Sequence, residues 1–205
     1  MKTLLCSVLA ICVLTGTLSV ANANPALGPE VAVVTIKIGK EKALQRVVIG
    51  LYDQAAPLTV QNFKELIGKK FYNGMRFHRV FPDTLVQTGD PKSRWGQSDR
   101  SGTGGPGYTI PCEINPAAKH KLGAIAAARL PDRINPAKAS NGSQFYACIR
   151  AMPELDGKYT VFGEVLEGLE GLQVISNERQ DSNDFPVKKI VIKSIKLEPR
   201  VPPAA

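Results

Sequence analysis

The sequence predicts a mainly β domain, an antiparallel barrel or sandwich whose open ends are covered by two short helices. Many short segments alternate apolar and polar residues and are separated by turn residues, whereas only two segments repeat apolar residues at a helical period. The 205 residues suit one domain with a short appendage. A hydrophobic content of 43% with 21% charged residues is typical of ordinary globular proteins.

The first 23 residues have the form of a secretory signal peptide. Lys2 supplies the positive start, residues 4–14 are apolar, and Ala21-Asn22-Ala23 is a cleavage site. The apolar stretch is short for a membrane span, so we expect a periplasmic or secreted protein with no stable membrane insertion after cleavage; an uncleaved anchor is the alternative. Residues 24–30 are expected to be a flexible leader.

The domain, expected over residues 31–198, opens with two alternating segments that predict a β-hairpin around a turn at 39–42. Their apolar members are Val34, Ile36, Ile38, Val47, Ile49 and Leu51. The period then changes to a helical one. Pro57 suits the first helical position, Val60, Phe63 and Ile67 form one stripe, and Gly68 suits the helix end.

Further strands are expected within 71–86 and at 122–128, 144–149 and 159–165. Residues 90–107 form a long loop that contains the only tryptophan, Trp95. A second short helix is predicted by Leu169, Leu172 and Ile175. The last strand changes parity between Ile192 and Ile195, which predicts one extra residue near Ser194, as in a β-bulge. A Pro-rich tail, 199–205, ends the chain.

Residues 77–90 carry the first functional signal. Phe77, Arg79 and Phe81 would share one face of a strand, and Leu85 and Gln87 one face of the next. If these faces coincide, a permanent cation, an amide and apolar groups converge on one patch. The alternative is that Arg79 is a solvated strand residue.

Five sequence blocks occur in an order that resembles the cyclophilin family of peptidyl-prolyl isomerases. They are Phe77-His78-Arg79, Gln87-Thr88-Gly89-Asp90, and the segments 102–108, 141–145 and 155–163. The resemblance covers about residues 31–197. It implies an eight-stranded antiparallel barrel capped by two short helices, and a peptidyl-prolyl cis-trans isomerase (rotamase) that needs no cofactor. Its partners would be Pro-containing peptides and unfolded exported proteins.

The resemblance also assigns site residues. Arg79 and Gln87 would be catalytic. The substrate-binding residues would be Leu85, Gly102, Ala128, Arg129, Gln144, Tyr146, Leu155 and Tyr159.

Four positions depart from the family's pattern. Thr84 and Tyr146 stand where a phenylalanine is usual, and Tyr159 where a histidine is common. Glu154 stands where many eukaryotic members have a tryptophan, so weak cyclosporin binding is expected.

Other functional classes are less well supported. Residues 102–107 match a dinucleotide-binding loop, but Tyr108 and Pro111 do not start the helix that such a loop needs. His78 and His120 are the only histidines, so no metal site is expected, and no serine lies on a nucleophile elbow. The net charge of +8, or +7 once Lys2 is cleaved off, comes from scattered basic residues, which argues against a nucleic-acid partner.

Two alternatives remain open. The same fold could be a chaperone or assembly module that binds proline-containing segments with little turnover. Cys112 and Cys148 could form a disulfide after export, or Cys148 could be a buried free thiol.

Overall fold

A computed structural model describes residues 24–96 and 101–201. The predicted signal peptide, part of the Trp95 loop (97–100) and residues 202–205 lie outside the described residues. The strands are β1 Glu30–Ile38, β2 Gln45–Leu51, β3 Arg79–Phe81, β4 Leu85–Thr88, β5 Ala124–Ala127, β6 Phe145–Cys148, β7 Val161–Glu167 and β8 Ile190–Pro199. The helices are α1 Pro57–Gly68 and α2 Leu169–Ser176, with short 3-10 turns η1 Pro91–Trp95 and η2 Pro153–Leu155.

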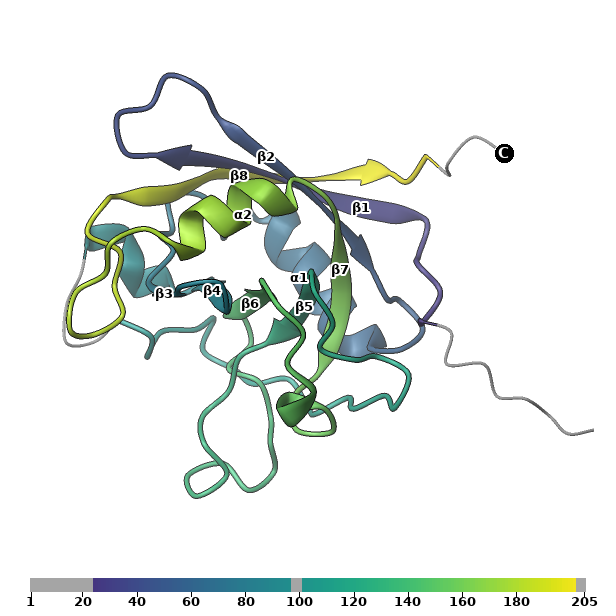
Figure 1. Cartoon of the computed structure of the whole chain (residues 1–205). Coiled ribbons are helices and arrows are strands. Elements are labelled where there is room, and N and C mark those ends of the chain that lie inside the picture. Colours follow the sequence, from purple (N-terminus) through teal and green to yellow (C-terminus); the bar gives the residue numbers. More distant parts are fainter. Residues whose placement is uncertain (1–23, 97–100, 202–205) are drawn as a thin grey trace, which may run out of the picture.

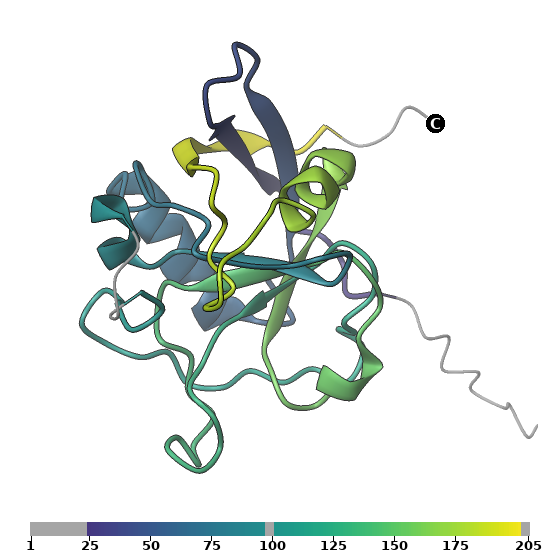
Figure 2. The ribbon, with the colours of Figure 1, turned by 60° about the vertical axis from the view of Figure 1, so that its left-hand side comes forward.

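The strands form one eight-stranded antiparallel sheet in the order β3-β4-β6-β5-β7-β2-β1-β8. The sheet curls until its two ends approach each other (Figure 1), and the Phe77 amide donates to the Ile190 carbonyl at 3.1 Å beside a bridge between Arg76 and Val191. The two helices lie on opposite sides of the strands (Figure 2). The predicted antiparallel barrel with two helices is therefore confirmed.

The β-bulge predicted near Ser194 is also confirmed. In the β1–β8 pair, Thr35 lies opposite Ser194 and Ile36 lies opposite Ile192, so Lys193 is the extra residue. A bulge lets both halves of a strand keep one face toward the core although their parity differs. Accordingly Ile192 and Ile195 are both buried.

Helix α1 follows the predicted stripe, with Val60, Phe63 and Ile67 buried against the strands. The Phe63 ring centroid lies 5.3 Å from those of Tyr72, Phe145 and Phe162. Pro57 is the first helical residue, as predicted.

The two ends of α1 are capped differently. The Glu113 carboxylate accepts from the Leu58 and Thr59 amides at 2.9 and 2.8 Å and so caps the helix start from a distant loop. At the other end Gly68 is the last helical residue, and the left-handed conformation falls on Lys70 (φ 53°).

The segment before β3 differs from the expectation. Residues 71–74 form turns, and within 75–77 only Arg76 makes an isolated bridge, with Val191. Gly74 has a φ of 80°, a conformation that breaks an extended strand. Phe77 is consequently buried in the main core and does not lie on the Arg79 face.

The ends of the described chain pack together. Gly28 donates to the Leu51 carbonyl at 2.8 Å, and the Arg200 side chain donates to the Gly28 carbonyl at 2.8 Å. Leu27 packs against a buried apolar cluster that includes Tyr52, Tyr146 and Met152. The expected leader is thus attached at its end, with Glu30 opening β1 and Pro199 closing β8, one residue beyond each expected boundary.

Cys112 and Cys148 are both free. Burial raises the pKa of the Cys148 thiol to about 12, so it is protonated at neutral pH. Across residues 24–96 and 101–201, no helix has the length and apolar character that crossing a membrane requires.

Candidate active site

A cleft of about 990 Å³ opens beside the β3–β4 hairpin, and its lining includes all ten residues assigned from the sequence. In the hairpin, Arg79 lies directly opposite Gln87 and Phe81 opposite Leu85. Paired residues in an antiparallel ladder share a face. The arginine face and the glutamine face therefore coincide, which is the condition that the sequence analysis set for a functional patch.

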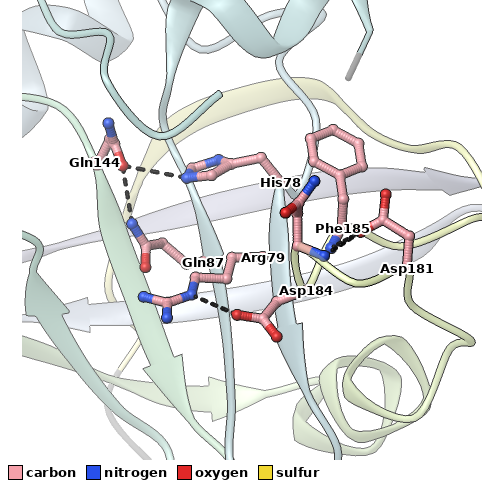
Figure 3. Close-up of polar contacts among 8 residues, drawn as sticks. His78, Arg79, Gln87, Gln144, Asp181, Asp184 and Phe185 are labelled. Atoms are coloured by element: carbon pink, nitrogen blue, oxygen red, sulfur yellow. Dashed lines mark hydrogen bonds and ion pairs between the residues drawn. The ribbon is translucent and has the colours of Figure 1, made fainter. Parts of the chain in front are cut away.

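Gln144 connects the polar residues of the cleft (Figure 3). Its Oε1 accepts from Gln87 Nε2 at 2.8 Å and contacts His78 Nε2 at 3.2 Å. Its Nε2 donates to the carbonyls of Gly102 and Gly104 at 2.9 and 2.8 Å. An amide has two donor hydrogens and two acceptor lone pairs, so the Gln144 amide is saturated. A substrate could bind it only by displacing one of these bonds.

His78 is neutral in this arrangement. Burial lowers its pKa, although the Asp90 carboxylate acts in the opposite direction. Because Gln144 Nε2 faces two carbonyls, its Oε1 must be the acceptor, and His78 must carry its proton on Nε2. The histidine therefore holds Gln144 and brings no positive charge to the cleft.

An apolar wall faces the polar groups. It consists of Leu85, Tyr146, Leu155 and Tyr159, which belong to one cluster with Met152 and the small residues of β5. The rings of Tyr146 and Tyr159 meet edge to face with centroids 5.9 Å apart. Leu85 and Tyr146 are on adjacent paired strands, β4 and β6, which places the wall next to Gln87.

The Tyr146 hydroxyl is satisfied within the protein. It lies 3.0 Å from His120 Nε2, and His120 Nδ1 lies 2.9 Å from the Asp156 carboxylate. Burial lowers the pKa of His120 despite this carboxylate, so Nδ1–H donates to Asp156 and the tyrosine hydroxyl donates to Nε2. The pocket thus has a phenol ring whose polar end is already bonded.

Arg129 closes another side of the cleft. Its guanidinium carbon lies 4.5 Å from the centre of the Tyr159 ring, and its Nη1 pairs with Asp132 at 2.6 Å. Its Nε donates to the Lys158 carbonyl at 2.9 Å. The side chain is therefore fixed as a wall, and a carboxylate balances its charge.

Two of the unusual residues do not line the cleft. The Thr84 hydroxyl donates to the Pro82 carbonyl at 2.9 Å, within the hairpin turn. Glu154 is exposed and pairs with Arg150 at 3.3 Å. Neither side chain places a polar group in the pocket. Because Thr84 stands where a phenylalanine is usual in the family, the pocket has no aromatic ring at that position.

Sequence reasoning did not find the loop 182–185, which forms one rim of the cleft. Within it Asp184 pairs with Arg79, and Phe185 is buried. The only local signal is the cluster of turn formers at 181–184, which predicts a turn and not its place in the fold. Among residues 24–96 and 101–201 no group of three His, Cys, Asp or Glu could hold a metal ion.

The fold and the cleft define a class of protein: an antiparallel barrel whose site combines a half-exposed guanidinium, an anchored amide and an apolar wall. The family model described as cyclophilin type peptidyl-prolyl cis-trans isomerase/CLD matches residues 33–197. The chain therefore belongs to the cyclophilin family and is a cyclophilin-type peptidyl-prolyl cis-trans isomerase.

Individual relatives agree with this assignment. The chain is 43% identical over 129 residues to peptidyl-prolyl cis-trans isomerase B of Bacillus subtilis, covering 62% of this chain and 80% of that protein. It is 38% identical over 151 residues to a peptidyl-prolyl cis-trans isomerase of Helicobacter pylori, covering 73% and 81%. A crystal structure of a Cryptosporidium parvum cyclophilin, determined in the presence of the dipeptide Ala-Pro, has a TM-score of 0.70 and 25% identity, covering 83% of this chain and 99% of that one.

Proposed function

We propose that Arg79 carries the catalysis by donating to the imide nitrogen of an X-Pro bond as that bond rotates. The barrier of roughly 18–20 kcal/mol exists because the nitrogen lone pair is delocalised into the carbonyl. In the rotated state the lone pair is localised, so a fixed donor stabilises the transition state more than the ground state. The observation that carries the proposal is the half-exposed Arg79 guanidinium directly opposite Gln87 at the edge of the apolar wall.

The other groups would hold the substrate while one side of the bond turns. The apolar wall has the character needed to bind a proline ring. Gln87 has one side-chain N–H bonded to Gln144, which leaves a positioned amide for the peptide backbone. On this geometry Gln144 supports Gln87, and it would contact the substrate only by giving up one of its own hydrogen bonds.

Exchange measurements on a short X-Pro peptide test the arginine mechanism. Arg79→Ala should lower kcat/KM by about 10²-fold or more, the scale of losing one preorganised donor. Arg79→Lys should also be poor, because an ammonium does not present the same fork of donors. Arg133→Ala removes an exposed loop arginine and is the matched control. Wild-type turnover in Arg79→Ala would refute the mechanism, and an inactive wild type would favour the binding-module alternative.

We propose further that the protein acts on exported polypeptides outside the cytoplasm. The form of residues 1–23, with a cleavage site ending at Ala23, supports this localisation. Intact-mass measurement on protein from the envelope or medium of the producing cell should give a chain that starts at or near Asn24. Recovery of the full-length chain in the cytoplasm would contradict the proposal.

We propose, finally, that the protein binds cyclosporin weakly. Glu154 is exposed, carries a charge and bonds Arg150, so it resists burial under a largely apolar ligand. A lost interface anchor costs about 2 kcal/mol or more, which is over tenfold in affinity. Titration of wild type and Glu154→Trp should show tighter binding by the tryptophan variant. Tight wild-type inhibition would show that Glu154 does not limit the drug.

A further inference from the structure

The guanidinium of Arg79 already has a partner inside the protein. Its Nε lies 3.3 Å from Oδ2 of Asp184, a residue 105 positions further along the chain (Figure 3). The guanidinium carbon also lies 4.6 Å from the centre of the Phe81 ring. Together these contacts hold one edge and one face of the guanidinium, so the terminal Nη groups form the edge left for other partners.

Asp184 itself is held by a rigid turn. The Asp184 carbonyl accepts from the Val80 amide at 2.9 Å, which attaches the turn to β3 next to Arg79. The Asp181 carboxylate accepts from the Asn183 and Phe185 amides at 2.8 and 3.1 Å. Asp184 has a φ of 62°, a left-handed conformation that aspartate and asparagine tolerate better than most residues. The carboxylate is thus presented to Arg79 by the backbone.

The charges around the cleft are balanced as a result. Among residues 24–96 and 101–201, its lining includes two arginines, and each pairs with a carboxylate: Arg79 with Asp184 and Arg129 with Asp132. His78, the one histidine of the lining, is neutral because burial lowers its pKa. The part of the cleft lining that the structure describes therefore lacks the excess positive charge that the whole chain, at +8, carries.

We propose that Asp184 is a positioning residue for Arg79 and that its charge offsets that of Arg79, so that the cleft does not favour anionic over cationic residues beside the substrate proline. The proposal rests on the catalytic role proposed for Arg79. Bonding at Nε would fix the direction of the Nη groups, which lowers the cost of orienting them in the transition state. The carboxylate would also cancel the attraction of the Arg79 guanidinium for a glutamate of a bound peptide and its repulsion of a lysine.

Two substitutions separate the roles of Asp184. Asp184→Asn keeps the left-handed turn and an oxygen that can accept from Arg79 Nε, but removes the charge. Asp184→Gly also suits the turn and removes the side chain. Asp83→Asn is the matched control: Asp83 is another aspartate with a positive φ (46°), it lies in the adjacent hairpin turn, and it does not line the cleft.

The charge role is read from kcat/KM for X-Pro peptides with Lys, Ala or Glu on either side of the proline. Because the cleft charges are balanced, wild type should turn over the Lys and Glu peptides within about twofold of each other. Both Asp184 variants leave the Arg79 charge unpaired and should favour the Glu over the Lys peptide by about two- to fivefold at low salt, the scale of an exposed charge pair. This preference should fade at high salt. Asp83→Asn should keep the wild-type ratio. An unchanged ratio in Asp184→Asn would overturn the charge role.

The positioning role is read from kcat with the Ala peptide and from the NMR signal of the Arg79 Nε–H, assigned by its loss in Arg79→Ala. Asp184→Gly should lower kcat by about fivefold or more with KM little changed, and should broaden that signal through faster exchange. Asp184→Asn should recover most of kcat and retain the signal. Equal kcat and an unchanged signal in Asp184→Gly would overturn the positioning role. Because the NMR signal does not depend on turnover, it separates failure of this inference from failure of the catalytic role of Arg79.

Discussion

Replacing Gln144 by leucine tests whether this residue supports the site or touches the substrate. The substitution keeps the approximate side-chain size and removes all four hydrogen bonds of the amide. The carbonyls of Gly102 and Gly104 and the side chains of Gln87 and His78 each lose a partner. We therefore expect the substitution to lower both the free energy of unfolding and the catalytic activity.

The magnitude follows from the number of bonds. A hydrogen bond contributes about 0.5–1.5 kcal/mol net, so four bonds correspond to about 2–6 kcal/mol. Because the cleft is open to water, some of the released groups can be solvated, and we expect a loss of about 2–4 kcal/mol. This is a large part of the 5–15 kcal/mol typical of a domain, and it corresponds to a fall in Tm of roughly 5–15 °C at this size.

The assay combines urea unfolding with X-Pro exchange kinetics. Gln87 would lose its anchor, so kcat should fall by about tenfold while the apolar wall keeps KM within a few-fold. Gln61→Leu is the matched control, because Gln61 lies on the exposed face of α1 and bonds only Glu65, at 3.1 Å, among the contacts described. An unfolding free energy within about 0.5 kcal/mol of wild type, with KM raised and kcat unchanged, would refute this reasoning. That result would instead make Gln144 a direct substrate contact, as the family resemblance implies.

Three further predictions follow from buried groups. Tyr146→Phe should cost about 1–3 kcal/mol, because His120 Nε2 loses its donor, while peptide exchange stays within about threefold of wild type; a larger loss of activity would assign the hydroxyl a role with the substrate. Burial lowers the pKa of both His78 and His120 below the ordinary 6.5, so the unfolded chain binds more protons than the folded one near that pH. The free energy of unfolding should therefore fall as pH drops through 6.5, by at most about 1.4 kcal/mol per pH unit for each histidine. Urea midpoints at pH 7.5 and 5.5 check this, and the midpoint of His120→Asn should change less between the two pH values. Phe63→Ala should cost about 3–5 kcal/mol in urea unfolding, since its ring contacts three buried aromatic rings, and a cost below 1 kcal/mol would mean that the core refills the space.

The sequence by itself determined which residues share a face. The β1–β2 hairpin, the stripe of α1 and the bulge near Ser194 all follow from periods of two or 3.6 residues and from turn formers between them. These features depend on neighbours close in the chain, where backbone geometry alone fixes direction. The order of the family's sequence blocks then supplied the barrel and the activity.

Only the tertiary structure decided which distant segments meet at the cleft. The approach of Asp184 to Arg79, the saturation of Gln144 by two glycine carbonyls and the turn of Thr84 away from the pocket have no periodic signal. The sequence pattern of residues 71–77 likewise predicts a strand. In the structure this segment is a connection that bridges to β8 where the barrel closes, and Phe77 is buried there. Such contacts join residues far apart in the chain, 105 positions in the case of Arg79 and Asp184. They are set by how the curled sheet closes and how each loop completes the hydrogen bonds of its own backbone, which no local pattern encodes.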